Sequence, residues 1–174
     1  EELESRAQIA AVLQPNDSTY ILAGTTEAQL NSDIPSEAIL IALNTDGNER
    51  WMKKYDEYTH ITSVTHTSDG GYFFGGLYGL IYVPFTEPYV AKTDEEGSLL
   101  WKKRDGWNLS TGRVNSVIPA GDGEVLVCGT SIDGSNNRGV FVSKLDANGS
   151  LLWTQQYGGP EDDHATEIVA TGQG

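Results

Sequence analysis

The chain has 174 residues, 38% of them hydrophobic, and 25 Asp and Glu residues outnumber 11 Lys and Arg residues to give a net charge of −14. This acidity predicts that the chain binds neither nucleic acid nor an anionic membrane surface, and no apolar run approaches the roughly 20 residues of a membrane span. A single cysteine, Cys128, excludes an internal disulfide and a thiolate-rich metal site.

An internal repeat organises the sequence. Three Trp residues recur at intervals of 50 and 52 residues, and each follows a Gly by four positions. A second Gly series recurs at intervals of 52 and 53 residues. These positions are Trp51, Trp101 and Trp153; Gly47, Gly97 and Gly149; and Gly24, Gly76 and Gly129. Periods of this length are typical of solenoids and propellers.

Each unit contains four short runs rich in β-branched and aromatic residues, which predict strands. In chain order the predicted strands are 9–13, 19–23, 38–43 and 50–55; then 61–65, 72–75, 89–93 and 99–103; then 114–118, 125–128, 140–145 and 151–157; and 165–169 opens a fourth unit. Asp69-Gly70 and Asp122-Gly123 predict tight turns between first and second strands. We expect the Gly before each Trp to make the equivalent turn between third and fourth strands.

These patterns predict an all-β fold in which each unit is a four-stranded antiparallel meander, the size of a β-propeller blade. The chain is then a single propeller-type domain over 1–174. Its blades span about 7–57, 58–110 and 111–162, and 163–174 supplies the first strand of a fourth blade.

The third unit carries the fullest signature. It contains Lys144-Leu145-Asp146, Asn148-Gly149, Leu151-Leu152-Trp153 and Tyr157-Gly158-Gly159. This pattern resembles the tandem-repeat β-propellers of bacterial and archaeal secreted or surface proteins. Where the third unit has Tyr157-Gly158-Gly159, the second has Asp105-Gly106-Trp107 and the first has Tyr55-Asp56-Glu57.

The spacing from Gly to Trp is also similar to that of quinone-dependent dehydrogenase propellers, whose blades dock a Trp against a Gly-containing turn. The chain has no adjacent Cys pair and no matching acidic site. The likeness to that family therefore stops at blade architecture.

Three units and one strand do not close a ring, because propellers typically have 4–8 blades. Three interpretations follow: the chain is a piece of a longer protein, several copies complete one ring by self-association through the open blade edges, or another chain covers those edges.

One group of candidate residues stands at the start of each predicted inner strand. Gln8, His60, Arg113 and His164 align there and would surround the mouth of a central channel. They either contact a ligand or anion, or form a solvated rim, which we favour. Two His residues without a third ligand do not predict a zinc site.

A second candidate is the loop between the second and third strands of the middle unit. The stretch 77–85 is too apolar for an ordinary exposed loop, and exposed patches of this kind mark interfaces. The predicted contacts with a protein partner are Tyr78, Leu80, Ile81, Tyr82 and Phe85. The alternative is that the stretch folds back onto a neighbouring blade.

Sequons at Asn16, Asn108 and Asn148 are candidates for glycosylation if the chain is secreted by a glycosylating cell. The Asp-rich turns lack the Glu that completes a calcium loop, and neither a nucleophile motif nor a phosphate-binding loop is present. We therefore predict no catalytic residue, metal or cofactor. Cys128 aligns with Ala23 and Gly75 and is expected to be a small buried thiol.

Together these features predict a non-catalytic binding or structural module of a secreted or cell-surface protein, which displays variable loops to protein partners. Two alternatives stay open. One is the scaffold of a quinone-dependent or polysaccharide-acting enzyme, and the other is a subunit of a surface assembly or filament.

Overall fold

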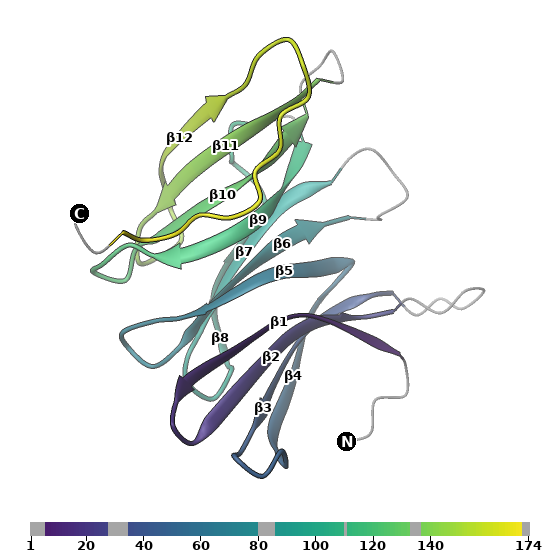
Figure 1. Cartoon of the computed structure of the whole chain (residues 1–174), viewed down its shortest axis with the longest axis vertical. Helices are drawn as coiled ribbons and strands as arrows, with labels where there is room; N and C mark the ends of the chain where they lie inside the picture. Colours follow the sequence, from purple (N-terminus) through teal and green to yellow (C-terminus); the bar gives the residue numbers. More distant parts are fainter. Residues whose placement is uncertain (1–5, 28–34, 80–85, 110, 133–136, 172–174) are drawn as a thin grey trace.

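The computed structural model describes residues 6–27, 35–79, 86–109, 111–132 and 137–171. These residues form twelve strands and no helix. The strands make three four-stranded antiparallel sheets, and each sheet is a meander of four consecutive strands (Figure 1). The predicted all-β fold and its three repeats are therefore confirmed. The described residues include no helix long and apolar enough to cross a membrane.

The strands agree closely with the predicted runs, most of them extended by a few residues. Their bounds are β1 Ala7–Asn16, β2 Thr19–Thr26, β3 Glu37–Leu43 and β4 Glu49–Glu57 in the first sheet; β5 Thr59–His66, β6 Tyr72–Tyr78, β7 Glu87–Thr93 and β8 Leu99–Lys103 in the second; and β9 Thr111–Pro119, β10 Val125–Ile132, β11 Arg138–Leu145 and β12 Leu151–Tyr157 in the third.

The series that begins with Gly24 marks a close approach between first and second strands. In each sheet the register shifts by one residue on the first strand beside this Gly, which is a β-bulge. A Cβ added at Gly24, Gly76 or Gly129 would collide with the carbonyl oxygen of the first strand, at Gln8, His60 and Arg113 respectively. Only Gly fits these positions, which explains why the series recurs.

The first and second sheets pack face to face through an apolar core. Ile21, Leu40 and Ala42 of the first sheet lie against Phe74 and Tyr89 of the second, and all five are fully buried. Because successive side chains point to opposite faces, Phe73 and Val90 project from the other face of the second sheet. They form a second core with the third sheet, which includes Val114, Val127 and Phe141.

A repeated contact joins neighbouring sheets at their outer strands. The Trp51 ring lies against the Gly97 turn of the second sheet, and a Cβ added at Gly97 would lie 2.9 Å from that ring. Trp101 packs in the same way on the Gly149 turn and donates a hydrogen bond from Nε1 to the Ala147 carbonyl oxygen at 2.8 Å. Both Trp rings therefore pack between neighbouring sheets.

The turn glycines also adopt the predicted backbone conformation. Gly47, Gly97 and Gly149 have φ of 80°, 76° and 80°, in the left-handed region that favours Gly. In the predicted first-to-second turns, Gly70 has φ of 90° and Asp122 has φ of 48°.

The segment 165–169, which was expected to be a strand, forms none: the structure has no strand between 158 and 171. It pairs with none of the twelve strands. It nevertheless runs back along the third sheet, as the yellow trace of Figure 1 shows. Its entry is held by a hydrogen bond from the Asp163 amide to the Arg138 carbonyl oxygen at 3.0 Å.

Candidate functional site

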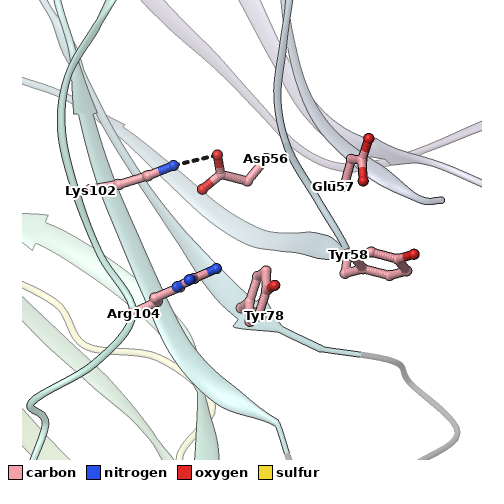
Figure 2. Close-up of a pocket in the computed structure, with 6 residues that line it drawn as sticks. All are labelled: Asp56, Glu57, Tyr58, Tyr78, Lys102 and Arg104. Atoms are coloured by element: carbon pink, nitrogen blue, oxygen red, sulfur yellow. Dashed lines mark hydrogen bonds and ion pairs between the residues drawn. The ribbon is translucent and has the colours of Figure 1, made fainter.

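A depression of about 360 Å³ opens at the seam between the first and second sheets. Six residues line it, and Figure 2 shows them. They are Asp56, Glu57, Tyr58, Tyr78, Lys102 and Arg104. Asp56 and Glu57 end β4, Tyr78 ends β6, Lys102 lies on β8 and Arg104 follows it, so both sheets contribute.

Asp56 is the charged centre of the depression. The Lys102 Nζ lies 2.5 Å from its Oδ1, and the Tyr89 hydroxyl donates to its Oδ2 at 3.4 Å. Burial, followed by the Asp56 charge, raises the pKa of Tyr89 above its usual range, so this hydroxyl stays protonated and remains a donor. The Asp56 charge is therefore neutralised within the protein.

Arg104 differs from Lys102 in lacking a carboxylate partner. Its guanidinium lies 4.4 Å from the centroid of the Tyr78 ring, over the ring face. No Asp or Glu among the described residues lies within ion-pair distance of it. The described residues accept no hydrogen bond from this guanidinium, so its N–H donors stay available to a ligand.

Tyr58 forms the far wall of the depression, beside Glu57 (Figure 2). It adopts a positive φ of 59°, which is uncommon for a residue with a side chain. Two backbone hydrogen bonds hold this conformation: its amide donates to Ser36 at 2.6 Å, and its carbonyl accepts from Gly79 at 2.8 Å. The 38% exposed Tyr58 ring is thus presented at a fixed place.

The aligned position in the next unit carries a buried indole. Trp107 stands six positions after Trp101, just as Glu57 stands six positions after Trp51. Trp107 is only 3% exposed, packs on Phe141 with ring centroids 6.2 Å apart, and lies under the Lys103 ammonium group. At the first seam the aligned residue is Glu57, an exposed carboxylate that lines the depression.

Of the predicted partner contacts, the structure places Tyr78 in this depression. Leu80, Ile81, Tyr82 and Phe85 lie outside the described residues. Sequence reasoning missed Asp56, Lys102 and Arg104. One signal in the sequence pointed to this region: the first unit has Tyr55-Asp56-Glu57 where the second has Asp105-Gly106-Trp107. This difference sets the first unit apart from its neighbour at the position of the depression.

Three of the four predicted channel-mouth residues occupy equivalent places, whereas His164, which was expected to start an inner strand, lies in a segment that forms none. Gln8, His60 and Arg113 stand near the start of the first strands and pair with Thr25, Leu77 and Thr130. Within the described ranges, none of the four forms a hydrogen bond or an ion pair with another. His60 places Nε2 3.1 Å from the Ser36 hydroxyl, and burial lowers its pKa. Their role at a channel mouth stays a prediction.

The three sequon residues are exposed. Asn16 accepts hydrogen bonds at Oδ1 from the Ser18 amide and hydroxyl, and Asn148 stands in the turn before β12. Their exposure leaves them accessible, and their modification stays a prediction. Cys128 is 4% exposed, and burial raises the pKa of its thiol, which fits the predicted inert packing role.

Within the part of the chain that the structure describes, no group of three or more His, Cys, Asp or Glu side chains could hold a metal ion. Neither a protein-family model nor a curated protein matches this sequence.

Proposed function

We propose that the chain is a non-catalytic binding module of a secreted or cell-surface protein, built from β-propeller blades. Three consecutive four-stranded meanders with repeated Trp-on-Gly contacts support the blade assignment. The module binds a protein partner at the depression between its first two blades.

One observation carries the binding proposal. The depression presents an Arg without a carboxylate partner and two Tyr rings beside the seam of the first two sheets. Arg and Tyr are enriched among the residues that dominate binding energy at protein interfaces. Because Lys102 already neutralises Asp56, the positive charge left for a partner is that of Arg104.

The partner segment is accordingly one with an acidic side chain beside an apolar or aromatic one. The carboxylate would pair with the in-plane N–H groups of Arg104, in the bidentate geometry that guanidinium groups favour. The neighbouring side chain would pack against Tyr58 and Tyr78. The exposed Glu57 at the opposite wall disfavours a second acid in the segment.

The test is selection of displayed random peptides on the immobilised chain. Enriched peptides should carry Asp or Glu next to an apolar or aromatic residue, and Arg104→Glu should weaken their binding about tenfold or more. Lys53→Glu is the matched control, because Lys53 is exposed on β4 and does not line the depression. Absence of enrichment, or peptides that bind Arg104→Glu as well as the parent, would overturn the proposal.

A further inference from the structure

The two internal seams define a complete interface, and each has the same two halves. One half is a Trp on a fourth strand, represented by Trp51 and Trp101, and the other is the glycine turn of the following sheet. At the first seam Tyr55 adds a hydrogen bond from its hydroxyl to the Gly97 carbonyl oxygen at 2.8 Å.

The third sheet carries the first half of this interface without the second. Trp153 occupies the place of Trp51 but is 40% exposed, and Tyr157 occupies the place of Tyr55 but is 58% exposed. The fourth strand of the third sheet therefore has the side chains that dock at the other seams, but the described residues include no glycine turn packed against them.

The first sheet carries the opposite half. A Cβ added at Gly47 would meet nothing within 4 Å, whereas one added at Gly97 or Gly149 would meet a Trp ring. On the same sheet Val12 is 62% exposed, although Val117 at the equivalent position is 2% exposed. Similarly, Ile9 is 39% exposed where Ile61 is 5% exposed. The exposed face of the third sheet and the exposed face of the first sheet therefore match each other, because the same two faces meet at each internal seam.

Rigid docking of these two ends meets one obstacle. Residues 164–171 already run along the third sheet (Figure 1), and β5 likewise lies against the first sheet. The entry bond from Asp163 to Arg138 matches the bonds from Tyr58 to Ser36 and from Gly112 to Thr86. A docking first sheet would bring β1 into this occupied place.

The alignment of the repeats shows how 164–171 and β1 of a second copy avoid competing for one place. In the aligned repeat, Ala165 and Ile168 correspond to Ile9 and Val12 of β1, so 164–171 can pair with β2 as β1 does. The chain thus holds four first-strand segments and three sets of second, third and fourth strands. Since much of β1 is exposed, it loses little burial by leaving.

We propose that the chain binds a second copy of itself by exchanging first strands. Residues 164–171 of one copy replace β1 on β2 of the next copy, and Trp153 of the first copy packs on the Gly47 turn of the second. Each contact repeats one that already exists within the chain, between Trp51 and Gly97 and between β5 and β6.

Light scattering over a concentration series should give masses at multiples of 18.9 kDa. Each copy carries a net charge of −14, so association should strengthen when salt screens the repulsion. Trp153→Ala should weaken association about tenfold or more, since Trp is a frequent hot spot. Leu152→Ala is the matched control, because this exposed position is not used when sheets pack. Leu152 is 49% exposed, and its counterpart Leu100 is 56% exposed even in the middle sheet, which packs on both sides.

A reversible lock tests the exchange itself. Val12 and Leu22 are direct cross-strand partners on β1 and β2, so Val12→Cys with Leu22→Cys can form a disulfide that holds β1 in place. The oxidised chain should stay monomeric, and reduction should restore association. A parent chain that is monomeric at every concentration and salt, or an oxidised lock that associates like the reduced form, would overturn the proposal.

Discussion

The two seams between neighbouring sheets are built from the same repeat, but they differ at the position six residues after the repeated Trp. At the second seam Trp107 closes the space between the sheets, with 3% of its surface exposed. At the first seam Glu57 stands at the equivalent position, and a depression of about 360 Å³ remains. Both seams share the same core packing and the same contact of Trp on a Gly turn. They differ six positions after the repeated Trp, where a buried indole stands at the second seam and an exposed carboxylate lines a depression at the first.

The largest effect is expected where the seam is filled. Trp107→Ala should lower the free energy of unfolding by about 3–5 kcal/mol, because a large buried side chain leaves a cavity. Urea unfolding followed by circular dichroism measures the change. Trp107→Phe is the control and should cost much less, because the buried Nε1 of Trp107 has no hydrogen-bond partner among the described residues. Equal losses for the two variants would contradict this account of the seam.

The converse change should convert the open seam into a filled one. Glu57→Trp is expected to occupy the depression and to weaken binding of selected acidic peptides about tenfold or more, equivalent to ~1.4 kcal/mol. Isothermal titration measures the affinity. Glu49→Trp introduces the same side chain at the exposed start of β4, outside the depression, and should leave affinity unchanged. Unaltered affinity of Glu57→Trp would separate the depression from binding.

The hydrogen bond across the first seam should make a smaller contribution. Tyr55→Phe removes the donor to the Gly97 carbonyl oxygen and should lower the free energy of unfolding by about 1 kcal/mol. Tyr157→Phe is the control in the monomer, because the exposed Tyr157 makes no hydrogen bond with its hydroxyl within the described residues. Chemical denaturation at low protein concentration compares the two, and a larger loss for Tyr157→Phe would contradict the assignment.

The smallest effect concerns a turn of the middle sheet. Hydrogen bonds from Lys92 and from Thr67 lower the pKa of Asp69 to about 2. Its contribution to stability is therefore present above the unfolded pKa and is lost as pH falls through about 2. Because the carboxylate is 54% exposed, we expect only about 0.5 kcal/mol.

Asp69→Asn should accordingly flatten the dependence of stability on pH between about 4 and about 2. Asp17→Asn is the matched control, because Asp17 lies in the equivalent turn of the first sheet and forms no ion pair among the described residues. An unchanged slope for Asp69→Asn would show that the pair with Lys92 is not a source of acid sensitivity.

Much of the fold was predictable because its signals are local and repeated. Gly97 and Trp101 predict a turn and a strand wherever they recur, and the continuous apolar runs of β6 and β7 indicate that both faces of the middle sheet are buried. The site was not predictable in the same way. Arg104 and Tyr78 are 26 residues apart in sequence and meet because β6 and β8 flank β7 in one sheet, and no short motif records that meeting. The strand predicted at 165–169 failed for a related reason, since strand formation requires a partner as well as a suitable sequence.

The measurement that tests the central claim most directly is a charge exchange across the first seam. An acidic peptide selected on the parent chain is compared with the same peptide in which the acid is replaced by Lys, against both the parent chain and Arg104→Glu. The account predicts that each single change weakens binding and that the double change restores it about tenfold relative to either. Failure of the double change to recover any affinity would contradict the assignment of Arg104 as the residue that receives the partner's carboxylate.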